Sequence, residues 1–234
     1  MKCVILQPSY IPWRGYFHQI QKADVFVFYD DVQYDRGGWR NRNRVKTANG
    51  PVWLTIPVAK KGSVETGAPI DSIRISWDRP WTKSHWATVQ QAYKKAPYFD
   101  TYRDLLEDIY GRRPELLADF TIETTVQIAG LLGLSDRSFL RSSQLKADGV
   151  KTDRLVSILQ QVGATHYISG PSARDYLEKE KLAAAGISLE YMQYDYEPYD
   201  QLYPPFEPQV SVIDLLMMTG PEAPRFIWGD DGTA

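Results

Sequence analysis

The first candidate site lies just after the first apolar run of the chain, residues 3–6. This run ends at Gln7, and Tyr10, Trp13 and Arg14 follow in a segment that two prolines make rigid. An amide and a phenol can position an acceptor group, and a guanidinium binds a carboxylate or phosphate through two parallel hydrogen bonds. We predict that Gln7 and Tyr10 act in catalysis. Trp13 and Arg14 are predicted to bind substrate.

A second candidate follows the apolar run at residues 24–28, where Asp30 and Asp31 stand side by side and Gln33 comes next. A carboxylate at the end of a strand can accept a proton or anchor an amine. Adjacent residues of a strand point to opposite faces, so the two carboxylates need not share a site. We predict that Asp30 acts in catalysis as a proton acceptor or amine anchor and that Gln33 is a substrate ligand. A turn that caps a helix is the structural alternative.

The third candidate is a polar and basic segment, residues 33–46, where arginines alternate with other residues. Because the whole chain carries a net charge of −2, a local pocket for a nucleotide or carboxylate is favoured over a nucleic-acid track. A solvated basic loop is the alternative. The predicted substrate ligands in this segment are Arg40, Asn41 and Arg42.

A fourth candidate lies where a predicted strand at residues 165–169 leads through Ser169 and Gly170 into a predicted helix. Hydroxyl and backbone N–H groups at such a junction can bind an anion, and ordinary capping of the helix by Ser172 is the alternative. His85 is predicted to bind substrate from another helix. The three histidines lack the spacing of zinc ligands, and the single cysteine excludes an intramolecular disulfide, so no metal is expected.

The elements that must position these residues alternate between strands and helices at both ends of the chain. We therefore predict one α/β domain over residues 1–228 with a central, mainly parallel sheet and a flexible tail at 229–234. A β-hairpin insertion is expected at about 48–78, with strands at 51–58 and 70–77 joined by a glycine-rich connection around Gly62 and Gly67. A helical cover is expected at about 80–134, with helices at 81–96, 99–110 and 113–132.

The first strand, loop and helix resemble the first crossover of HUP- or Rossmann-like nucleotide-binding folds. Ligands in such sheets bind beyond the carboxyl ends of the strands. Gly15, just inside the predicted helix, would let a ligand approach the backbone closely. We therefore expect Gln7, Asp30 and Arg42 to share one hollow.

Composition limits the classes of function. The chain has 234 residues, with 15 Tyr and 7 Trp, side chains that suit packed cores and also pockets that stack sugars or bases. Its low net charge predicts no nucleic-acid partner, and no apolar run is long enough to span a membrane. A cytoplasmic location is expected.

Seven segments, in order, resemble the WbqC-like family: QPSYIPWRGYF, ADVFVFYDDVQY, WRNRNRVK, LTIPV, AYKKAPYF, THYISGPSARDYL and YEPYDQLYPPFEPQVSVIDLLMMTG. The resemblance implies a place beside bacterial surface-polysaccharide genes or in small-molecule pathways, without a defined reaction. The recurring polar pattern of the family falls on Gln7, Tyr10, Trp13, Gly15, Asp30, Gln33, Arg40, Asn41, Arg42, Tyr93, Tyr98, Ser169, Gly170, Tyr176, Gln201 and Asp214.

These observations lead to three hypotheses. The first is transfer of an acyl or aminoacyl group onto an amino- or hydroxyl-bearing small molecule, such as an amino sugar nucleotide or an amino acid. The second is nucleotidyl transfer or nucleotide-dependent ligation, for which a nucleotide is the one cofactor considered. The third is a non-catalytic scaffold in polysaccharide assembly. The expected partner is a small-molecule substrate, and a homodimer is compatible with the sequence.

Overall fold

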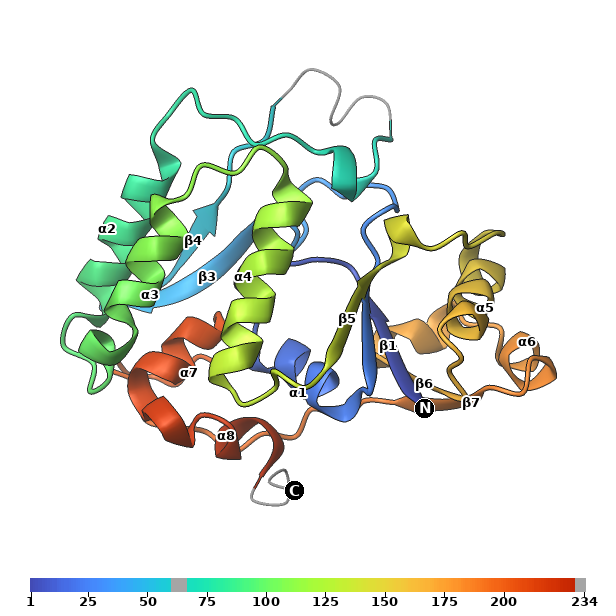
Figure 1. Ribbon diagram of the computed structural model, residues 1–234. Helices are drawn as coiled ribbons and strands as arrows, with labels where there is room; N and C mark the ends of the chain where they lie inside the picture. The colour runs from blue at the N-terminus through green and yellow to red at the C-terminus, as the bar shows by residue number, and fades with distance from the viewer. Residues whose placement is uncertain (60–66, 230–234) are drawn as a thin grey trace.

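The computed structural model describes residues 1–59 and 67–229, and within them five strands form a central parallel sheet (Figure 1). Their order across the sheet is β5-β2-β1-β6-β7, and all neighbouring strands run parallel. The α/β class and the mainly parallel sheet are therefore confirmed. The strands are β1 (Lys2–Leu6), β2 (Val25–Phe28), β5 (Ser138–Arg141), β6 (His166–Ser169) and β7 (Ser188–Tyr191).

The sheet is buried on both faces, which is why its inner strands are short continuous apolar runs. Alternate residues face opposite layers: Val4 and Phe26 pack into a larger core, whereas Cys3 and Val25 pack into a smaller one. In Figure 1 the helices α5 and α6 stand on one side of the sheet, and the other helices gather on the other side. The helices are α1 (Arg14–Lys22), α2 (Trp81–Tyr93), α3 (Phe99–Gly111), α4 (Leu117–Leu131), α5 (Lys151–Gln161), α6 (Lys179–Ala184), α7 (Val212–Thr219) and α8 (Arg225–Trp228).

The strand order reverses beside β1. The chain runs from β1 to β2 and β5 in one direction across the sheet, and then from β6 to β7 in the other. The connections that leave β1 and β6 therefore diverge at the carboxyl ends of these strands, and a crevice opens there in sheets of this kind. This arrangement places the loop after β1, which contains Gln7, beside the segment after β6.

The hairpin differs from its predicted position. Its strands are β3 (Arg42–Thr47) and β4 (Gly50–Thr55), which pair antiparallel, so the last five residues of the expected basic loop, 42–46, belong to a strand. The predicted strand at 70–77 is wrong. Only isolated bridges and the 3-10 helix η1 (Ile70–Ser72) form there, because Ile70 and Ile73 are both buried at a spacing that suits one tight turn.

The helical cover is confirmed as three helices, α2, α3 and α4, which bury their apolar faces in the larger core. The predicted connection at Gly62 and the tail at 230–234 lie outside the described residues, and the division into one domain stays a prediction. In the described part of the chain, no helix is both long and apolar enough to cross a membrane.

Candidate functional site

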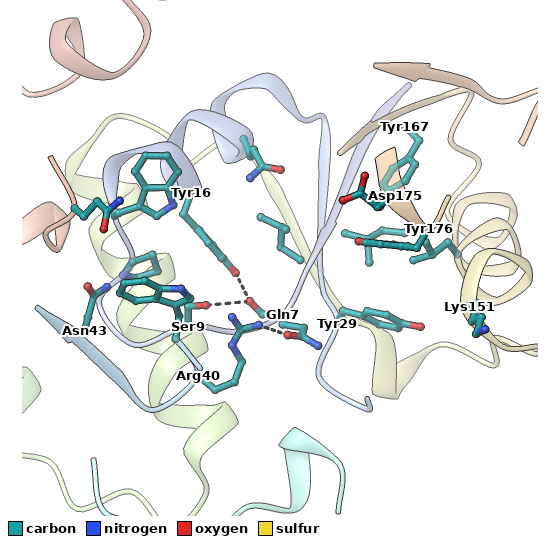
Figure 2. A pocket seen from close by; sticks show the side chains of 18 of the residues that line it. Gln7, Ser9, Tyr16, Tyr29, Arg40, Asn43, Lys151, Tyr167, Asp175 and Tyr176 are labelled. Carbon is teal, nitrogen blue, oxygen red and sulfur yellow. Dashed lines mark hydrogen bonds between the residues drawn. The ribbon is translucent and has the colours of Figure 1, made fainter. Parts of the chain in front are cut away.

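A cavity of about 1140 Å³ opens at the carboxyl ends of β1, β2 and β6. Figure 2 shows Gln7 near its centre, with Tyr16, Ser9, Arg40 and Asn43 on one side. On the other side lie Tyr29, Lys151, Tyr167, Asp175 and Tyr176. The cavity therefore joins the loop after β1 and the region before β3 to the segments around α5 and the 3-10 helix η3 (Pro171–Asp175).

Gln7 organises the first wall. Its backbone carbonyl accepts hydrogen bonds from the Tyr16 hydroxyl at 3.1 Å and from the Ser9 hydroxyl at 3.5 Å. Its side-chain oxygen accepts a hydrogen bond from Nη1 of Arg40. Since the amide oxygen of Gln7 is occupied in this way, its NH₂ group is the part that remains for a ligand.

Arg40 is a cation with little compensating charge. Its side chain is only 14% exposed, and its ion-pair partner is Asp35, at 3.9 Å between Nε and Oδ1. The Asp35 side chain is 56% exposed, so water weakens this pair further. Burial lowers the pKa of Arg40, while Asp35 opposes the shift. A guanidinium in such surroundings is suited to bind a carboxylate or a phosphate that enters the cavity.

The second wall is aromatic with a few charged groups. Tyr29 follows β2, Tyr167 belongs to β6, and Tyr176 is 63% exposed at the cavity mouth. Asp175 also lines this wall, and its carboxylate has no ion pair or hydrogen bond within residues 1–59 and 67–229. An unengaged carboxylate thus stands opposite a guanidinium, as two poles of the cavity, and Lys151 and Glu178 add one charge of each sign to its lining.

The backbone is strained at both walls. Ile11, between Ser9 and Pro12, has a φ of 37°, which is a rare conformation for a β-branched residue. Nδ2 of Asn43 holds this turn by donating to the carbonyls of Tyr10 and Ile11, at 3.1 and 2.8 Å. Lys151, on the opposite wall, has a φ of 51°. Strain of this kind collects at functional sites, where the surrounding structure maintains it.

Trp13 lines the cavity, and its predicted role in binding substrate stays a prediction, whereas the space beside Gly15 is not open to a ligand. A Cβ atom on Gly15 would lie 2.3 Å from the Trp13 ring. The space left by this glycine is therefore filled by the indole and not by a ligand. The ring is also fixed at its edge by Tyr194, at 4.9 Å between centroids.

Tyr10 and His85 lie in the core and not in the cavity. The Tyr10 hydroxyl, fully buried, is 2.9 Å from Nδ1 of His85 and 2.8 Å from the Tyr110 hydroxyl. Burial raises the pKa of Tyr10 well above its usual value and lowers that of His85 to about 4. These neutral groups form a polar chain that joins the loop after β1 to α2 and α3.

Asp30 is fully buried behind the site. Its two oxygens accept hydrogen bonds from Arg141 at 2.6 Å, from Ser142 at 3.1 Å, and from the backbone and hydroxyl of Ser143, both at 2.9 Å. A carboxylate with this many donors is already saturated. These hydrogen bonds join the end of β2 to the 3-10 helix η2 (Ser142–Gln144).

Two further predicted ligands bind other parts of the chain. Nη1 of Arg14 donates to the carbonyls of Glu197 and Phe226, at 2.9 and 3.1 Å, so it anchors the C-terminal segment to α1. Nδ2 of Asn41 donates to the Ile56 carbonyl at 2.8 Å. Both side chains satisfy backbone groups.

The other predicted ligands are also absent from the cavity lining. Arg42 lies over the ring of Trp53, at 4.3 Å, and Gln33 is exposed beside Pro69. Ser169 donates to the hydroxyl of Tyr167 at 3.3 Å, behind the cavity wall. Gly170 precedes only a five-residue 3-10 helix, so the expected α-helix start is not formed there.

The structure thus brings together Gln7, Trp13 and Arg40 among the predicted site residues. The expected shared hollow of Gln7, Asp30 and Arg42 is not formed. Whether the other predicted residues act in catalysis stays a prediction. The sequence analysis did not select Tyr29 and Asp175, which line the cavity. Each comes after a strand that ends there, and this position in the sequence could have indicated them. Lys151 has no local signal because it comes from the distant α5.

Comparison with known proteins places the chain in a family. No solved structure matches it, so the HUP- or Rossmann-like character of the first crossover stays a prediction. A protein of Mycobacterium tuberculosis (strain ATCC 25618 / H37Rv), the uncharacterized Rv1507c, is 40% identical over 228 residues, which cover 97% of each chain. The model of the WbqC-like protein family matches residues 7–226. The chain therefore belongs to the WbqC-like protein family.

Proposed function

We propose that the cavity beside Gln7 is the active site of an enzyme that transfers an acyl or aminoacyl group to an amine or hydroxyl of a small molecule. The observation that carries this proposal is the pairing of two poles across one cavity. Arg40 and Gln7 stand on one wall, and the unengaged Asp175 carboxylate stands on the other. A biosynthetic role in bacterial surface polysaccharides or specialised metabolites follows from the family resemblance.

The proposed step uses both poles. The acceptor nitrogen or oxygen forms a bond to the carbonyl carbon of the donor, and its proton passes to Asp175. The electron pair of the carbonyl bond moves onto oxygen, where Arg40 and the Gln7 NH₂ group stabilise the negative charge. When the carbonyl re-forms, the bond to the leaving group breaks, and that group takes the proton from Asp175.

The aromatic lining supports a ring-bearing or partly apolar substrate. Trp13, Tyr29 and Tyr176 line a cavity of about 1140 Å³, which is as large as pockets that enclose whole cofactor-sized ligands. Aromatic faces hold such groups with few internal rotations to restrict. A concave site of this depth favours an enzyme over the non-catalytic scaffold, which would need a broad contact surface.

Nucleotidyl transfer or nucleotide-dependent ligation is the second candidate. The reversal of strand order beside β1 favours it, because nucleotides bind at that position in doubly wound sheets. A strict requirement for ATP or CTP with Mg²⁺ would support this candidate. Turnover of an activated acyl donor without any nucleotide triphosphate would support acyl transfer.

The test is a product screen by mass spectrometry, with amino sugar nucleotides and amino acids as acceptors and acyl-CoA or aminoacyl esters as donors. We expect Asp175→Asn to lower kcat by about 10²-fold or more, because the proton acceptor is lost. The matched control is Asp200→Asn, an exposed aspartate that does not line the cavity. Equal turnover by wild type and Asp175→Asn would refute the role of this carboxylate.

A further inference from the structure

Three arginines, Arg36, Arg40 and Arg42, form a cluster in one short segment beside the cavity. Arg40 lines the cavity, and Arg42 lies over the ring of Trp53, which adjoins the cavity-lining Trp39. The same three guanidinium groups oppose the rise that burial and the Asp35 carboxylate cause in the pKa of Tyr34.

The positive charge of this cluster is poorly balanced. Arg40 has the distant Asp35 as its partner, and neither Arg36 nor Arg42 forms an ion pair with any residue in the described ranges 1–59 and 67–229. Among these three guanidinium groups, Arg40 alone has an ion pair in the described ranges, and its partner is half-exposed. Clusters with such an excess of arginine are built for anions with several oxygens, because each planar fork can bind two of them.

An aromatic platform adjoins the arginines. The rings of Trp39 and Trp53 lie 5.3 Å apart, and each residue is 43% exposed. Arg42 lies over Trp53 at 4.3 Å, whereas Trp39 also lines the cavity. The platform is therefore continuous with the cavity on one side and with the arginines on the other. Two neighbouring, half-exposed tryptophan rings offer aromatic faces on which a base can stack.

We propose that Arg36, Arg42, Trp39 and Trp53 form a subsite for the nucleoside diphosphate portion of the substrate. The base stacks on the tryptophan rings, Arg36 and Arg42 hold the diphosphate, and the group attached to it extends past Arg40 into the cavity toward Gln7. This inference rests on the proposed function, since it names the class of acceptor that the cavity receives. A polynucleotide is disfavoured because the platform has two rings and the chain is net acidic.

Titration calorimetry with UDP, CDP, ADP and GDP tests the proposal on the whole chain. We expect at least one of them to bind, with uridine or adenosine alone and inorganic pyrophosphate alone binding at least about tenfold more weakly. Arg42→Gln and Trp53→Val should each weaken the diphosphate about tenfold. Trp53→Phe, which keeps an aromatic face, should restore most of the affinity. Arg103→Gln, on the exposed side of α3, is the control for loss of an arginine and should not alter binding.

Three results would overturn the subsite. They are the absence of binding by every nucleoside diphosphate at about 1 mM, unchanged affinity in both Arg42→Gln and Trp53→Val, and tighter binding of a short oligoribonucleotide than of any mononucleotide. Circular dichroism of each variant separates a lost subsite from a lost fold. Because the assay measures binding and not turnover, nucleotide binding that depends on Arg42 in a protein without transferase activity would refute the proposed reaction and leave the subsite intact.

Discussion

Replacing Asp30 by asparagine tests whether this carboxylate is structural or catalytic. Asp30 is fully buried, and it pairs with Arg141 at 2.6 Å while accepting three further hydrogen bonds from Ser142 and Ser143. Breaking a buried pair typically costs 3–5 kcal/mol of unfolding free energy. Arg141 keeps its second partner, Asp119, at 2.6 Å, so we expect the lower end, about 3 kcal/mol.

Urea unfolding followed by tryptophan fluorescence measures this change. The matched control is Asp119→Asn, which removes the other partner of the same arginine. Asp119 has a side chain that is 40% exposed, so its loss should cost below about 1 kcal/mol. If Asp30→Asn unfolds within about 0.5 kcal/mol of wild type, the structural interpretation of Asp30 is refuted. A folded Asp30→Asn protein that loses turnover would return this carboxylate to the catalytic site.

Two further predictions concern the core and the first crossover. The pKa of His85 is lowered by burial from 6.5 to about 4, so the unfolded chain takes up a proton that the folded chain does not. The contribution of neutral His85 to stability is therefore fully present above pH ~6.5, and the free energy of unfolding falls by up to about 3 kcal/mol as the pH drops toward 4. In His85→Gln, the free energy of unfolding should change less steeply with pH over this window than it does in wild type. The same pH dependence of the unfolding free energy in both proteins would contradict a lowered pKa of His85. In Gly15→Ala the new methyl group would lie 2.3 Å from the Trp13 ring. We therefore expect the free energy of unfolding to fall by about 1–3 kcal/mol and the tryptophan emission to shift. An unshifted spectrum with unchanged stability would show that the ring is not held there.

Parts of the site could be predicted because they depend on local sequence. Gln7 and Trp13 follow the first apolar run, and a parallel strand that ends there must deliver them to the carboxyl edge of the sheet. Arg40 was found by its place in a basic segment. The hairpin was predicted at the wrong residues because a polar segment such as the one with Arg42 and Asn43 does not resemble a strand in sequence. In the structure, pairing with β4 holds these residues in a strand.

The sequence by itself determined the alternation of apolar runs with amphipathic segments, and hence a mainly parallel sheet whose carboxyl edge receives the loop after β1. Only the tertiary structure decided which polar groups at that edge have no partner among residues 1–59 and 67–229. Asp30 and Arg14 have the same side-chain chemistry as Asp175 and Arg40, but each is satisfied by partners more than 100 residues away. The reason is physical: a charged group is available to a ligand only when folding leaves its hydrogen bonds unfilled, and those partners come from long-range contacts that no local pattern encodes.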